Sequence, residues 1–219
     1  MTLPAGGSAT FMDTQASGYP HRFYRARSGA ILSYNSLGYL VVNVPSGDSM
    51  IANQLDNPAG NTVGVLLPNP PDGTTLYKWN EGAQQFVINS FESGDEGGFF
   101  WSDPNMTLNP GEGALIQPGA PTTFTFLADL RQGTLANPYP SNVSMRSSMV
   151  PQTGPLDTAL GFQPVQGDRI DRMNNAAGAY DPYVFFAGGW FPTVPIPRVG
   201  ESFWVSGTGS TWTRAFLIW

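Results

Sequence analysis

Apolar residues in this chain fall in short segments that alternate with polar residues or run continuously, and tight-turn sequences separate the segments. The turns include Pro-Asp-Gly, Asn-Glu-Gly and Asn-Pro-Gly-Glu-Gly, which supply the fixed φ of proline and the positive φ of glycine or asparagine. Short apolar segments between such turns are typical of antiparallel strands. In the first half of the chain the pattern predicts strands at 39–44, 49–55, 75–80, 85–90, 113–117 and 122–127.

A short helix is one possible structure for residues 57–67. Gly60 and Gly64 disfavour a helix, and the corresponding stretch of the second half, 154–161, is shorter still. We therefore expect a turn-rich connection at 57–67.

The pattern of the first half recurs in the second half. Residues 38–45 match 133–140, and residues 70–80 match 164–174. Trp101 matches Trp190, and 111–116 matches 200–205, with the same spacing from the tryptophan in both copies. Such self-similarity indicates a duplicated unit. It predicts two tandem homologous modules, 38–127 and 133–219, each a small antiparallel β-sandwich or barrel.

Residues 1–34 lie outside the repeat. Residues 9–13 and 21–27 read as two strands around a turn that contains Gly18 and Pro20, which predicts an N-terminal β-hairpin extension. An isolated hairpin is marginally stable in water. We therefore expect it to pack on the first module, on a preceding domain or on another chain.

Composition excludes several classes of function. The net charge is −6 and the ten basic residues are scattered, so nucleic acid is not an expected partner. The chain has no cysteine, which excludes disulfides and thiolate metal sites. No apolar run approaches the roughly 20 residues that span a bilayer, so we expect no membrane insertion.

The first copy carries three distinctive segments: Ser-Met-Ile-Ala-Asn-Gln-Leu-Asp-Asn, Asp-Gly-Thr-Thr-Leu-Tyr-Lys-Trp-Asn and Leu-Asn-Pro-Gly-Glu-Gly. With these segments the repeat resembles modules near the C-termini of large secreted proteins of verrucomicrobial and planctomycete bacteria. Residues 22–27 resemble the last strand of the immunoglobulin-like or fibronectin-like domain that often precedes such modules. The second copy departs from the pattern at Arg146, Asp171 and Met173. The resemblance implies an extracellular or cell-surface location and supplies no catalytic residues.

Few residues offer catalytic or metal-binding chemistry. His21 is the only histidine, so a multi-histidine metal site is excluded. Glu112 and Glu201 match each other, and two carboxylates could serve as the acid and base of a glycoside hydrolase. Their repetition after a turn favours a structural role, in which each carboxylate accepts hydrogen bonds from turn amides. We expect no catalytic residue, no metal and no cofactor.

Several aspartates lie in loops near glycine or proline, a setting that permits an oxygen-lined calcium site. No Asp-x-Asp-x-Asp-Gly run is present, which favours ordinary turn aspartates. These residues are Asp13, Asp72, Asp95, Asp103 and Asp168.

The aromatic residues give the best sequence hint of a binding surface. Neighbouring residues of a strand point to opposite faces, so adjacent aromatic residues cannot all enter one core. The matched Trp101 and Trp190 are expected in the core, since duplicated modules retain shared packing, yet a flat platform for sugar rings stays an alternative. The candidate ligand-binding residues are Phe99, Phe100, Trp101, Phe186, Trp190 and Phe191.

Taken together, the sequence predicts a non-catalytic structural or adhesive module of an extracellular or cell-surface protein, such as a fibre or matrix subunit. Its expected partners are neighbouring domains or protomers of the same protein. The alternative is a carbohydrate-binding module that holds polysaccharide on exposed aromatic rings.

Overall fold

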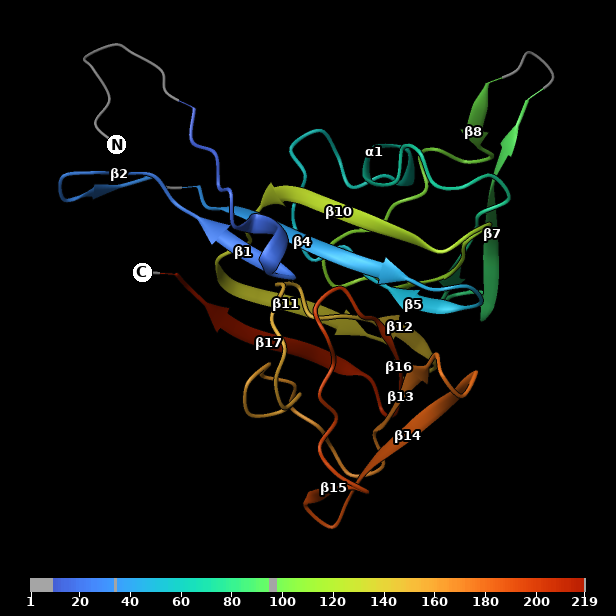
Figure 1. The fold of residues 1–219 in the computed structure, drawn as a ribbon. Helices are drawn as coiled ribbons and strands as arrows, with labels where there is room; N and C mark the ends of the chain where they lie inside the picture. The colour runs from blue at the N-terminus through green and yellow to red at the C-terminus, as the bar shows by residue number, and fades with distance from the viewer. Residues whose placement is uncertain (1–9, 34, 95–97, 219) are drawn as a thin grey trace.

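The computed structural model describes residues 10–33, 35–94 and 98–218. Two larger sheets form most of the first half of the molecule (Figure 1). A three-stranded sheet has the order β1 (His21–Tyr24), β4 (Leu37–Val44) and β10 (Thr122–Asp129). A five-stranded sheet has the order β5 (Ser49–Ile51), β9 (Ala114–Gln117), β6 (Thr75–Asn80), β7 (Gln85–Ser93) and β8 (Phe99–Trp101).

The second half contains a two-stranded sheet and another five-stranded sheet. The first of these pairs β11 (Gly133–Tyr139) with β17 (Ser210–Phe216). The second has the order β12 (Ser144–Arg146), β16 (Phe203–Ser206), β13 (Arg169–Asn174), β14 (Ala179–Phe186) and β15 (Gly189–Phe191). The order is that of the first five-stranded sheet, strand for strand, and the ladders are antiparallel. The fold is therefore nearly all-β, and each sheet is open in the residues described.

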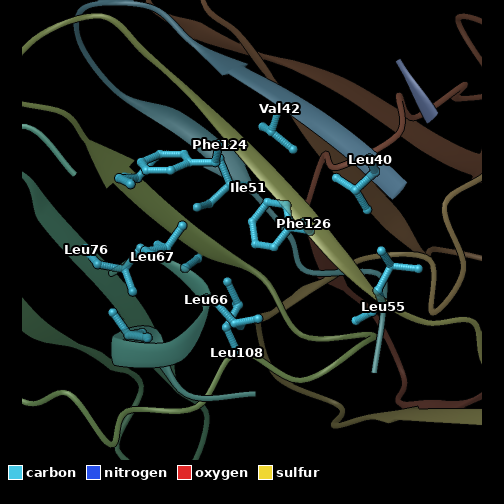
Figure 2. Close-up of a cluster of buried hydrophobic side chains, with 14 of the residues drawn as sticks. Leu40, Val42, Ile51, Leu55, Leu66, Leu67, Leu76, Leu108, Phe124 and Phe126 are labelled. Carbon is cyan, nitrogen blue, oxygen red and sulfur yellow. The ribbon is translucent and has the colours of Figure 1, made fainter. Parts of the chain in front are cut away.

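Alternation along the strands directs side chains into the core. In β4 Leu40, Val42 and Val44 are buried while their neighbours are more exposed, as a period of two requires. The paired strand β10 adds Phe124 and Phe126 on the same side. Figure 2 shows four of these side chains facing leucines of the opposite layer; the four are Leu40, Val42, Phe124 and Phe126, and the leucines include Leu66, Leu76 and Leu108.

The main hydrophobic core extends across both halves of the chain. It contains residues from β4, β6 and β10, and also Leu135, Val150 and Phe216 of the second half. A second core lies wholly in the second half and is formed by Tyr139, Leu156, Leu160, Phe162, Ile170, Phe203, Val205 and Trp212. The two halves thus share part of their buried surface.

Two local predictions need correction. A one-turn helix, α1 (Val63–Leu66), occupies part of the expected turn-rich connection, because Val63 and Leu66 are one turn apart and both enter the core. Strand β5 ends at Ile51 rather than residue 55, because Asn53 accepts from the amide of Leu55 and donates to the Leu108 carbonyl instead. Side-chain hydrogen bonds here replace the ladder.

The expected N-terminal hairpin is also wrong for the residues described. Residues 10–13 form no strand, and β1 pairs with β4 instead of with them. A smaller hairpin follows, between β2 (Arg27–Ser28) and β3 (Ile31–Leu32), and a short 3₁₀ helix, η1 (Ala16–Gly18), precedes β1. The longer ladder on β4 outweighs local pairing because it covers an otherwise open sheet edge.

Candidate functional site

Trp101, one of the predicted ligand-binding residues, belongs to the core. Its side chain is only 3% exposed, and its indole N–H donates to the Leu67 carbonyl at 2.8 Å. Its ring also packs against Phe91, with 5.4 Å between ring centroids. A ligand cannot stack on this ring.

Phe99 and Phe100 are exposed at 55% and 58%, on the outer strand β8. The Phe99 ring stacks on Phe91, with 6.0 Å between centroids. The Phe100 ring lies over Gly94, where an added Cβ would come within 2.4 Å of it. These two rings are available to a partner.

Phe186, Trp190 and Phe191 gather at the turn between β14 and β15. The turn has two residues, and Ala187 and Gly188 adopt φ of 52° and 82°, as a tight hairpin with primed turn geometry requires. Phe186 and Phe191 are 65% and 73% exposed, while Trp190 packs against Phe162 and Phe185. The three predicted residues line a shallow apolar hollow of about 440 Å³.

The structure does not unite the two aromatic groups. Phe99 and Phe100 lie on the β7–β8 hairpin, and Phe186 and Phe191 on the β14–β15 hairpin, at opposite ends of the molecule in Figure 1. A single extended platform is therefore absent from the described residues, and each hairpin is a separate candidate surface.

The side chains of Glu112 and Glu201 each accept a hydrogen bond from a turn amide, as their repetition predicts. Glu112 accepts from the Asn109 amide at 2.6 Å and from the Lys78 ammonium at 2.9 Å. Glu201 makes the matched contacts, with the Arg198 amide at 2.9 Å and with the Arg172 guanidinium at 2.6 and 2.8 Å. Both carboxylates are thus engaged by a turn amide and a cation.

These glutamates also mark the contact between the two halves. Isolated β-bridges join Glu201 to Ile51 and Glu112 to Arg146, which are matched positions of the repeat. The adjacent amides repeat the correspondence: Ala52 donates to the Gly200 carbonyl at 2.9 Å, and Ser147 donates to the Gly111 carbonyl at 3.0 Å. The halves therefore meet through two equivalent sets of contacts.

A hollow lies beside each set of contacts. The first hollow, of about 400 Å³, is lined by residues that include Pro20, His21, Val41, Met50 and Glu201. His21 enters from β1, and its Nδ1 is buried without a hydrogen-bond partner among the described residues. Burial lowers the pKa of this histidine below its ordinary value of 6.5.

The second hollow has a volume of about 430 Å³. Ala136, Met145 and Glu112 line it, and they match Val41, Met50 and Glu201 of the first hollow. Arg146 stands where the first hollow has Ile51, and it forms an ion pair with Glu81. The residues that line this hollow come from 78 to 149, so none of the described residues takes the place that Pro20 and His21 have in the first hollow. The second hollow is thus more charged, and it lacks a counterpart of β1.

The loop aspartates have several structural roles. Asp13 accepts from Arg22 and, at 2.7 Å, from the Tyr24 hydroxyl, and these hydrogen bonds lower its pKa. Asp168 is fully buried and accepts from the Val165 amide at 3.0 Å. Asp103 accepts from the Asn105 amide at 3.0 Å. Asp95 lies outside the described residues.

Within residues 10–33, 35–94 and 98–218, no three His, Cys, Asp or Glu side chains group closely enough to hold a metal ion. In the same part of the chain, no helix combines the length and apolarity needed to cross a bilayer.

Comparisons with family models, with curated proteins and with solved structures find no match to this chain.

The two hollows were not predicted from the sequence. One signal could have indicated them: 21–24 has no counterpart ahead of the second copy, where the preceding module leaves only 128–132 before residue 133. A repeat that lacks one strand in one copy leaves an edge open at the matched place.

Proposed function

We propose that this chain is a non-catalytic structural or adhesive module of an extracellular or cell-surface protein. In this proposal two homologous tandem modules, 38–127 and 133–219, form one rigid block. The block binds neighbouring domains or protomers of the same protein through exposed β surfaces.

The duplication is supported by topology and by contacts together. The two five-stranded sheets share one strand order, and the bridges Ile51–Glu201 and Glu112–Arg146 connect matched positions reciprocally. Lys78 and Arg172, also matched, neutralise the two glutamates. Such reciprocal contacts are typical of an interface between two related units.

One observation carries the proposed role. The two matched carboxylates that could form an acid–base pair are already engaged, since Glu112 and Glu201 bind turn amides and cations. The described surface instead presents the exposed rings of Phe99, Phe100 and Phe191, and the strand edges of open sheets. Exposed rings and open edges are features that another polypeptide covers.

Sedimentation of the whole chain across a concentration series, with electron microscopy of the concentrated sample, tests this proposal. We expect concentration-dependent assembly that weakens when residues 1–34 are deleted. A control variant, Ile196→Ala, removes an exposed apolar side chain that does not line the hollow at the β14–β15 turn, and it should assemble normally. A chain that stays monomeric at all concentrations, and binds no neighbouring domain, contradicts the proposal.

The apolar hollow at the β14–β15 turn favours carbohydrate binding as a second candidate function. Phe186 and Phe191 are exposed there and could stack on sugar rings. A polysaccharide array with the wild-type chain, Phe191→Ala and Ile196→Ala separates the two functions. Retention on a glycan that Phe191→Ala alone abolishes would support this candidate, and no retention on any glycan would remove it.

A further inference from the structure

Strands β4 and β11 occupy matched places in the two halves but differ in their neighbours. Strand β4 has a strand on each side, β10 and β1. Strand β11 pairs with β17 alone. Its second edge has no strand in the described part of the chain.

Backbone groups of β11 point out of this edge. Thr213 of β17 lies opposite Ala136, yet its amide and carbonyl bond to the Gln163 side chain rather than to β11. Residues opposite each other in an antiparallel pair direct their backbone groups either both inward or both outward. Ala136, and Thr134 two residues earlier, therefore direct their N–H and C=O groups away from β17.

Strand β1 shows how the matched edge is filled. The Val41 amide, matched to Ala136, donates to the Pro20 carbonyl at 2.9 Å. Arg22 lies opposite Tyr39 and Phe23 opposite Gly38, which are matched to Thr134 and Gly133. No hydrogen bond to the amides of Thr134 or Ala136 is found among the described residues outside the β11–β17 ladder.

The open edge borders the second hollow. Ala136 and Pro138 line that hollow, whereas the matched first hollow contains Pro20 and His21 from β1. Pro138 has no amide hydrogen, and its carbonyl accepts from Arg146 at 2.9 Å, so the edge available for pairing ends before it. The open stretch, 133–136, corresponds to the stretch of β4 that β1 covers.

The same chain contains a segment suited to this edge. Residues 10–13, Thr-Phe-Met-Asp, pair with no strand, and Phe11 and Met12 are 70% and 78% exposed. The segment precedes β1, which stays on β4. Asp13 accepts from Arg22 and Tyr24 of β1, so strand addition elsewhere exchanges these two hydrogen bonds for strand pairing and leaves the β1–β4 ladder intact. Thr10 and Phe11 repeat the polar-then-aromatic order of Arg22 and Phe23.

We propose that residues 10–13 of a second copy of this chain add as a strand to the open edge of β11, beside the second hollow. This inference rests on the proposed assembly function and identifies the contact through which two copies assemble. The incoming strand runs antiparallel to β11, with Phe11 opposite Gly133 and Thr10 opposite Thr134, the register that β1 adopts on β4. Each copy carries one donor and one acceptor, so addition gives a closed dimer or a growing chain.

Disulfide trapping tests the register, because the natural chain has no cysteine. A Thr10→Cys chain is mixed with a Thr134→Cys chain under mild oxidation. Directly opposite residues of paired strands lie within disulfide reach, so we expect a cross-linked heterodimer. The matched control is Thr213→Cys, an exposed threonine on β17, which should cross-link at least about tenfold less.

Thr134→Pro tests the edge itself, with Thr134→Val as its control. Thr134 is exposed and lies opposite Thr10 in the proposed register, and proline removes its outward amide, whereas valine retains it. We expect Thr134→Pro to weaken assembly at least about tenfold and Thr134→Val to leave it unchanged. Circular dichroism of both variants checks that the fold is intact, and the trapping experiment decides the matter if the proline variant does not fold.

The results separate this inference from the function on which it rests. Wild-type assembly that persists equally in Thr134→Pro, or disulfide trapping that is no stronger at Thr134 than at Thr213, overturns the β11 contact while the assembly function stands. Absence of assembly in the wild type, together with no trapping, overturns both.

Discussion

At the scale of single residues, burial separates aromatic side chains that the sequence places together. Trp101 and Phe100 are neighbours on β8, but the indole lies in the core with its N–H bonded to Leu67, and the phenyl ring lies at the surface. The alternation of a strand accounts for the difference. The sequence could predict that some of these rings are exposed, but not which ones.

Trp101→Ala should therefore lower the free energy of unfolding by about 3–5 kcal/mol, the usual cost of removing a large buried ring. Phe100→Ala should change it by less than about 1 kcal/mol, because its ring is exposed. Urea unfolding followed by circular dichroism measures both. Equal losses for the two variants would contradict the assignment of Trp101 to the core.

The two matched glutamates offer a second comparison at this scale. The Arg172–Glu201 pair has side chains 16% and 12% exposed, whereas the Lys78–Glu112 pair has 22% and 32%. Glu201→Gln leaves a more deeply buried cation without its bidentate partner, and we expect it to destabilise the fold by about 2–3 kcal/mol. Glu112→Gln should cost about 1 kcal/mol. Urea titration of both variants gives the comparison, and a larger loss for Glu112→Gln would refute it.

At the scale of the elements, most strands were predictable because one face of each is buried. β4, β6, β9 and β10 fall within a few residues of their expected ranges, since alternating apolar residues point into one core. Strand β8 was missed as a strand, because Phe99–Trp101 is a short aromatic run whose partner in β7 cannot be read from local pattern. The helix α1 was missed because tertiary burial of Val63 outweighs the two glycines.

The position of β1 shows the limit of sequence pattern at this scale. The sequence identifies 21–27 as strand-forming but cannot state its partner, because pairing with β4 is set by an open edge that exists only in the folded molecule. For the same reason the candidate site could be predicted only in part. The aromatic residues were found, whereas the two hollows depend on the meeting of distant segments.

The attachment of β1 should depend on pH through His21. Burial lowers the pKa of His21, so the folded chain disfavours its protonated form. The contribution of neutral His21 to the stability of the folded chain is complete above pH 6.5. It is lost as the pH falls toward the lower pKa of the folded chain, because the unfolded chain then binds the proton more readily. Arg198 and Glu201 also line the first hollow, and Glu201 forms an ion pair with Arg172.

Hydrogen exchange of the Val41 amide, which bonds to Pro20, reports this attachment. Its protection should fall between pH 7.5 and pH 5.5 in the wild type, after correction for the intrinsic exchange rate. The fall should be absent in His21→Gln, which cannot titrate. An equal loss of protection in both chains would show that another group controls β1.

At the scale of the whole molecule, close packing at glycine joins the two halves. A Cβ at Gly113 would lie 2.4 Å from the Ser202 Cβ and 2.8 Å from the Met145 Cγ, both in the second half. At a second contact between the halves, a Cβ at Gly200 would lie 2.3 Å from the Val42 Cγ2 of the first half. Because the main core also includes Leu135 and Phe216, neither half buries all its apolar surface alone.

Gly113→Ala should therefore destabilise the molecule as a unit. We expect a loss of about 2–3 kcal/mol from overpacking against a Cβ that cannot easily move. Gly189→Ala is the matched control, since nothing lies within 4 Å of a Cβ at that strand position. Scanning calorimetry should show one transition for the wild type and for both variants, shifted to lower temperature only in Gly113→Ala, because the shared core makes unfolding of one half expose the other. Two separated transitions in the wild type would mean that the halves unfold independently, and that the contacts at Gly113 and Gly200 do not couple them.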